Sequence, residues 1–179
     1  MKFIPISLVC LFIVLSNLHA SNEVYFSQED KNTCIISNGI PNHEIGKFPS
    51  KGNPHSFSPQ RLKYCFPTNP VKNNYINNTA KTIGITITGI PIRPGTADWY
   101  DASSPRKHSR DRSSGWNLEA ITPREKIFGI DANNAHVDNR GLYHYHGMPK
   151  KLSNFNGKSL VGYAADGHEI HYVGSKQKS

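Results

Sequence analysis

Short segments of alternating apolar and polar residues run along this chain, and turn-forming Gly, Pro, Asn and Ser interrupt them repeatedly. The clearest alternation lies over Thr82–Ile90, where Ile83, Ile85 and Ile87 are separated by small or polar side chains. A period of two predicts a β-strand with one buried face. Weaker forms of the pattern predict further strands at Thr33–Ser37, Leu142–His146, Leu160–Ala164 and Glu169–Val173.

Helical periodicity is scarce in this chain. The spacing of Trp116, Leu118 and Ile121 predicts one short helical turn that ends before Pro123. The segment Asn38–Asn78 is rich in Asn, Pro and Lys and predicts a long irregular loop. We therefore expect a mainly β fold: a single β-rich domain, sandwich-like, with long loops and few short helical turns.

The most apolar segment of the chain lies at its N-terminus. Lys2 precedes the apolar run Phe3–Leu15, and the polar stretch Ser16–Ala20 follows. The run is well short of the ~20 residues that cross a bilayer, and its order is typical of a secretory signal peptide. We expect residues 1–20 to be a signal peptide, and residues 21–179 to form one exported domain, periplasmic or extracellular, without a membrane span.

Cysteine usage agrees with export. Cys34 and Cys65 are the two cysteines that remain after the signal peptide. An even pair in an exported chain is most simply one disulfide. That bond would pin the long loop between the two residues and argues against a thiolate nucleophile.

The chain is basic, with a formal net charge of +8, and part of the excess lies in the run Arg106–Arg112. Basic runs can mark contact with nucleic acid. This run, however, lies in a Ser-rich loop, lacks interleaved aromatic residues and contains Asp111. We therefore expect a solvated loop and no nucleic-acid binding. The sequence names no protein partner.

The strongest candidate chemistry lies in the run Tyr143–His146. On an extended segment His144 and His146 share one face while the two tyrosines share the other. Two positions along a strand are roughly 6.5–7 Å apart, a gap that two imidazoles can close around one metal ion. Tyr and His are also acceptable residues of a half-buried strand, so this pattern alone leaves a purely structural role open.

A third histidine lies close in sequence. A turn at residues 139–141 would fold His136 back towards the pair, and Asp138 lies beside it. Asp166 could approach if the strand from Leu160 pairs with residues 142–146. These five side chains are the candidate metal ligands, and Zn²⁺ or Cu²⁺ best matches three imidazoles. The ligand set consists of His136, Asp138, His144, His146 and Asp166.

The chain resembles the YHYH-domain family through segments spread over most of its length. They are Ser37–His43, Gly46–Pro49, Gly52–Pro54, Gly89–Ile92, Pro94–Thr96, Trp116–Ala120, Asn134–Asp138, Gly141–Pro149 and Leu160–Gly167. The resemblance implies an exported, β-rich protein and leaves the biochemical role unknown. The chain departs from the family in lacking a cysteine between Asp131 and His136. It also ends soon after His168–Tyr172, so the domain is expected to be short at its C-terminus relative to longer relatives.

Three classes of function fit these observations. The first is an exported protein that binds Cu or Zn through His144 and His146 together with His136. The second is an extracellular hydrolase, metal-assisted or His/Asp-based, in which Asp138 or Asp166 orients a histidine. The third is a structural polar core with a surface-binding role. The sequence has no Gly-x-Ser-x-Gly, His-Glu-x-x-His or phosphate-loop motif, which favours binding over catalysis.

Histidines outside this group carry less weight. His43 is expected to hydrogen-bond its own loop, and His55 and His108 to be solvated in polar loops. Asp98 and Glu119 each lie near an aromatic residue, where partial burial could suit a carboxyl group to acid catalysis.

Overall fold

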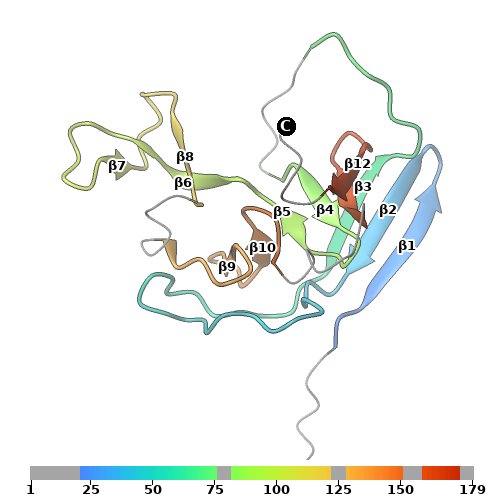
Figure 1. The fold of residues 1–179 in the computed structure, drawn as a ribbon, viewed down its shortest axis with the longest axis horizontal. Coiled ribbons are helices and arrows are strands. Elements are labelled where there is room, and N and C mark those ends of the chain that lie inside the picture. The colour runs from blue at the N-terminus through green and yellow to red at the C-terminus, as the bar shows by residue number, and fades with distance from the viewer. Residues whose placement is uncertain (1–20, 76–81, 122–127, 151–158, 174–179) are drawn as a thin grey trace, which may run out of the picture.

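The computed structural model describes residues 21–75, 82–121, 128–150 and 159–173 (Figure 1). The predicted signal peptide lies outside the described residues. Within them, twelve β-strands form three sheets, which confirms the expected mainly β fold with long loops. No helix in these ranges has the length and the apolar character needed to cross a membrane.

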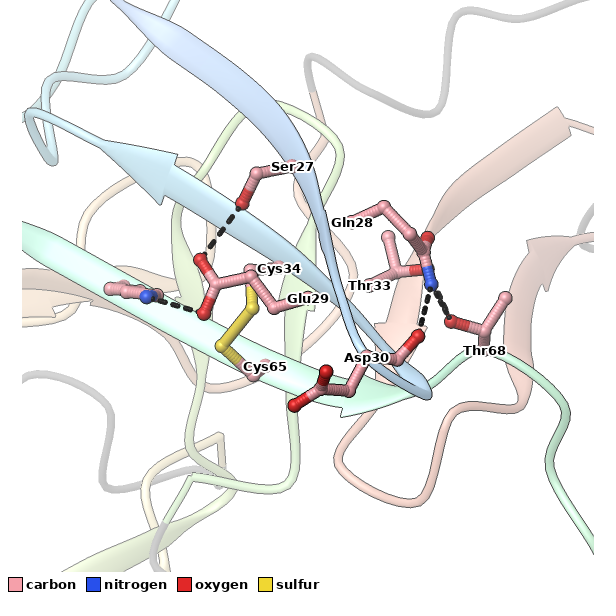
Figure 2. Close-up of a disulfide and its surroundings, with 9 residues drawn as sticks. Ser27, Gln28, Glu29, Asp30, Thr33, Cys34, Cys65 and Thr68 are labelled. Atoms are coloured by element: carbon pink, nitrogen blue, oxygen red, sulfur yellow. Dashed lines mark hydrogen bonds and ion pairs between the residues drawn. A yellow bond between two sulfur atoms is a disulfide. The ribbon is translucent and has the colours of Figure 1, made fainter.

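Sheet A is antiparallel and consists of β1 (Val24–Glu29), β2 (Asn32–Ser37) and β3 (Leu62–Pro67), in that order. Cys34 on β2 lies directly opposite Cys65 on β3, with their Cα atoms 4.0 Å apart, and the two form a disulfide. Figure 2 shows this bond crossing between the two strands. The predicted disulfide is therefore confirmed, and it joins the strands from which the long loop leaves and to which it returns.

Sheet B holds the candidate site. Its strand order is β12-β11-β4-β5-β10-β9, and β10 runs parallel to β5 while the other neighbours are antiparallel. The strands are β4 (Gly84–Thr86), β5 (Pro91–Ile92), β9 (Ala135–Val137), β10 (Tyr143–Tyr145), β11 (Ser159–Ala164) and β12 (Glu169–Tyr172).

The single strand predicted over Thr82–Ile90 is wrong, because β4 ends at Thr86 and the chain turns back into β5. Gly89 adopts a φ of +76°, a conformation that glycine reaches without strain. The Thr86 hydroxyl accepts a hydrogen bond from the Ile90 backbone N–H at 3.0 Å and closes the turn. Ile85 on β4 is buried, whereas Ile83, directly before the strand, is 42% exposed, so the alternating isoleucines do not share one buried face.

Sheet C has the order β7-β6-β8 and consists of β6 (Gly95–Tyr100), β7 (His108–Ser109) and β8 (Asn117–Glu119). Figure 1 shows it extending away from sheet A. The helical turn predicted from Trp116 is wrong in its described part. The Asn117 side chain donates to the Thr96 and Asp98 carbonyl oxygens, which holds β8 extended against β6.

Two apolar clusters include residues of sheet B. Ile35 and Phe66 of sheet A pack with Ile85 of β4, and the Phe66 ring stacks on Tyr163 at 4.7 Å between centroids. This contact joins sheets A and B. The second cluster is centred on the fully buried tyrosines of β10, and the long loop covers it with Ile45, Phe48 and Phe57.

Candidate metal centre

The β9–β10 hairpin brings the three candidate histidines together. His136 on β9 lies directly opposite His144 on β10. Asp138 shapes the connection, since its Oδ1 accepts hydrogen bonds from the backbone N–H groups of Arg140 at 2.8 Å and Leu142 at 3.2 Å. Gly141 completes the turn with a φ of +84°. The turn predicted from the sequence is therefore confirmed, together with the return of His136 towards the pair.

The two faces of β10 differ as its alternation predicts. His144 and His146 lie on one face and both are nearly buried, at 4% and 5% exposure. The His146 Nε2 lies 3.1 Å from the His144 Nε2 and 3.0 Å from the His136 Nε2. Three imidazole nitrogens, from β9, β10 and the residue directly after β10, thus converge on one point.

A backbone carbonyl fixes the tautomer of each histidine. The Nδ1 atoms of His136, His144 and His146 lie 2.7, 3.1 and 3.3 Å from the carbonyl oxygens of Phe128, Leu142 and Pro94, respectively. A carbonyl oxygen only accepts hydrogen bonds, so each Nδ1 carries the proton. Each neutral ring therefore directs the lone pair of its Nε2 towards the other two.

This arrangement matches the ligand sphere of a small transition-metal ion. Nitrogens bound at about 2.0–2.1 Å around one tetrahedral ion lie about 3.3 Å from one another. The ligand atoms of the three histidines all lie within 4.8 Å of one another, and the two closest pairs fall slightly inside the tetrahedral spacing. Histidine ligands commonly donate their second ring nitrogen to a carbonyl group, as these three do.

Burial keeps these rings neutral. Burial, with the neighbouring histidines as a second cause, lowers the pKa of His144 to about 2. Burial and the proximity of His136 lower the pKa of His146 to about 4. Burial also lowers the pKa of His136, although its bond to the Phe128 carbonyl opposes the shift. At neutral pH the cluster therefore offers three uncharged nitrogen donors.

Asp138 does not join the group of converging ligand atoms. Its Oδ2 accepts a hydrogen bond from Arg93 Nη1 at 3.0 Å, and both side chains are 17% exposed. Burial would raise the pKa of Asp138, but hydrogen bonds from Arg140, Arg93 and Leu142 outweigh it and hold that pKa below its ordinary value. In this structure Asp138 shapes the turn and balances the charge of Arg93.

Asp166 also lies away from the cluster. It is exposed in the turn between β11 and β12, where its Oδ1 accepts a hydrogen bond from the His168 backbone at 3.3 Å. Its predicted approach required β11 to pair with β10. That pairing is wrong, because β4 and β5 lie between the two strands in sheet B.

A second polar network, which the sequence did not reveal, lies on the tyrosine face. The Tyr143 hydroxyl donates to Asp131 Oδ2 and the Tyr145 hydroxyl lies against His43 Nε2, each at 2.6 Å. His43 Nδ1 also contacts the Glu44 carbonyl oxygen at 2.8 Å, so the expected loop-bonding role of His43 is confirmed. Asp131 carries only the weak sequence signal of an Asp followed by turn-forming residues.

The expectation that His108 is solvated is wrong. Its side chain is 1% exposed, because β7 places it against β6, and its Nδ1 lies 3.0 Å from Asp98 Oδ2. Arg110 Nε contacts the other oxygen of the same carboxylate at 3.1 Å. His55 is partly exposed in the long loop and lies outside the converging group.

Fold and cluster together define a β-rich protein with a three-histidine candidate metal centre. Comparison with family models gives a match to the YHYH family, described as YHYH protein, over residues 63–179, which include all three histidines. The chain belongs to this family, as its motifs predicted. Searches among curated proteins and among solved structures gave no match.

Proposed function

We propose that this YHYH protein is an exported protein that binds a transition metal, Zn²⁺ or Cu²⁺, through His136, His144 and His146. The observation that carries the proposal is the convergence of three Nε2 atoms whose lone pairs face one another, with pairs at 3.0 and 3.1 Å. Facing lone pairs repel unless a cation lies between them. Imidazole nitrogen is a preferred ligand of both ions.

A purely structural polar core accounts less well for this geometry. Hydrogen bonds between the rings would require a proton on Nε2 in addition to the proton on Nδ1, which makes an imidazolium. A buried imidazolium is costly, in line with the lowered pKa values of His144, about 2, and His146, about 4. A metal ion satisfies the lone pairs without adding protons.

Export is supported by two independent features. The segment Lys2–Ala20 has the charged, apolar and polar order of a signal peptide. The disulfide between Cys34 and Cys65 is a bond that persists in oxidising compartments and is rare in the cytosol. Both features favour a protein that binds its metal in the periplasm or outside the cell.

Elemental analysis tests metal binding directly. Residues 21–179 are produced without a histidine tag, incubated with Zn²⁺ or Cu²⁺ and desalted, beside a His144→Ala, His146→Ala double variant. The matched control is a His168→Ala, His171→Ala double variant, which removes two exposed histidines of the β11–β12 hairpin. We expect near-stoichiometric metal in the parent and the control and its loss in the folded double variant. No metal in the parent with either ion would refute the proposal.

A metal-assisted hydrolase is the second candidate. The observation that favours it is the number of ligands: among the described residues three histidines converge, which leaves one position of a tetrahedral ion for water. Zinc-loaded protein that hydrolyses an activated ester, with loss of turnover in the His144→Ala, His146→Ala variant, would favour catalysis. Stoichiometric zinc without such turnover would favour carriage or storage.

A further inference from the structure

The His108 side chain is buried in an unusual state. Its Nδ1 is held by Asp98 Oδ2 at 3.0 Å, while its Nε2 is buried without a hydrogen-bond partner in the part of the chain that the structure describes. An unpaired buried nitrogen costs stability, and an apolar side chain of similar size would avoid that cost. The position therefore suggests a role other than stability for this ring and for the carboxylate that orients it.

A short series of contacts connects this pair to the metal centre. The His108 ring packs against the Phe128 ring, with centroids 5.9 Å apart and planes inclined at 49°. The Phe128 carbonyl oxygen accepts the hydrogen bond from His136 Nδ1 at 2.7 Å, the shortest of the three bonds that fix the tautomers. His108 thus contacts the residue that orients one candidate ligand.

The other two ligands are oriented differently. The carbonyl that holds His144 belongs to Leu142, two residues earlier in the same segment. The carbonyl that holds His146 belongs to Pro94, directly before β6. His136 instead depends on the carbonyl of Phe128, whose own ring packs against His108 of β7, so a side-chain contact from sheet C reaches this ligand.

We propose that the Asp98–His108 pair positions His136 through Phe128 and thereby sets the affinity and geometry of the metal centre. The inference rests on the proposed function. Asp98 holds the imidazole in one orientation, the imidazole supports the Phe128 ring, and the Phe128 carbonyl holds His136. Neither residue touches the metal, so both are positioning residues.

The test compares four variants of residues 21–179: His108→Ala, Asp98→Ala, Asp98→Asn and Arg110→Ala. Removing groups that orient a metal ligand typically weakens affinity about 10–100-fold, and we expect the low end, about 10-fold, for His108→Ala and Asp98→Ala. Asp98→Asn keeps an oxygen that can accept the His108 Nδ1–H, and Arg110→Ala removes only the exposed partner of the same carboxylate. The Zn²⁺ affinity of these two variants should lie within about threefold of the parent's. That change is smaller than the loss of about 10-fold expected when a ligand loses its orienting group.

Two measurements separate positioning from simple destabilisation. Competition with a chelator gives the Zn²⁺ affinity, and the Cu²⁺ electron paramagnetic resonance spectrum reports the ligand geometry. Altered spectra in folded His108→Ala and Asp98→Ala, and the parent spectrum in Asp98→Asn and Arg110→Ala, would support the inference. If His108→Ala does not fold, the affinity and spectrum of Asp98→Ala decide whether the inference holds.

The two proposals fail differently. A parent that binds neither ion refutes the proposed function and the inference together. A parent that binds metal, beside folded His108→Ala and Asp98→Ala variants with the parent affinity and spectrum, refutes the inference alone.

Discussion

The two tyrosines of β10 allow one matched test of the network behind the candidate metal centre. Tyr143 and Tyr145 are both fully buried, with ring centroids 5.7 Å apart, and the hydroxyl of each lies 2.6 Å from a side chain of another segment. The partners differ in charge, since Tyr143 donates to the Asp131 carboxylate and Tyr145 meets the His43 imidazole. Tyr143→Phe and Tyr145→Phe therefore remove the same atom from the same strand but break bonds of different kinds.

The expected magnitudes follow from that difference. A hydrogen bond to a charged acceptor contributes about 1.5–3 kcal/mol to stability, and a bond between neutral groups contributes about 0.5–1.5 kcal/mol. We expect Tyr143→Phe to lower the free energy of unfolding by about 2 kcal/mol and Tyr145→Phe by about 1 kcal/mol. Burial and Asp131 both raise the pKa of Tyr143, so its hydroxyl stays protonated and able to donate.

Urea unfolding of metal-free protein at pH 7.5, followed by circular dichroism, measures both variants against the parent. The slope of the unfolding free energy against urea concentration should be the same in all three proteins, so that a shift of the midpoint reports a change in stability. When the variants are instead loaded with metal, the amount they bind should equal that of the parent, because the tyrosines lie on the face opposite the histidines. An equal loss in the two variants, or a larger loss for Tyr145→Phe, would refute the assignment of Asp131 as a charged acceptor.

Two further predictions concern stability. Metal-free protein should become less stable as the pH falls from 7.5 to 5.5, because burial lowers the folded-state pKa of His144 to about 2 and of His146 to about 4, and the unfolded chain takes up protons first. The loss is about 1.4 kcal/mol for each ring over that range, and urea titrations at a series of pH values with no such loss would contradict it. Replacing Cys34 and Cys65 by serine should lower the free energy of unfolding by about 3–4 kcal/mol, the loop-closure value for their separation of 31 residues. A thermal midpoint equal to that of the parent would exclude this contribution.

Local pattern and turn chemistry were sufficient to predict the centre of the site. Alternation placed His144 and His146 on one face of a strand, and the turn at residues 139–141 brought His136 opposite them. Both inferences depend on residues within a few positions of one another. The disulfide was predictable for a different reason, since Cys34 and Cys65 are the two cysteines that would remain after the expected signal peptide, and two cysteines have one simple pairing.

Contacts between distant segments could not be predicted in the same way. Alternation over Thr82–Ile90 does not reveal that Gly89 reverses the chain, and strand order decides that Asp166 stays away from β10. The burial of His108 arises from pairing between β6 and β7, which a polar run of sequence conceals. Asp131 acquires its role from a tyrosine hydroxyl twelve residues later.

The carbonyl groups that hold the three histidines belong to the main chain, and this affects how the histidine cluster can change in evolution. A side-chain acceptor disappears with a single substitution, whereas the carbonyls of Pro94, Phe128 and Leu142 persist whatever residue occupies those positions. The protonation pattern of the three histidines is therefore inherited with the backbone path. A motif search detects three histidines and nothing of what orients them, so related three-histidine sites are better sought by the backbone path through all three carbonyl-bearing segments than by the identity of the residues there.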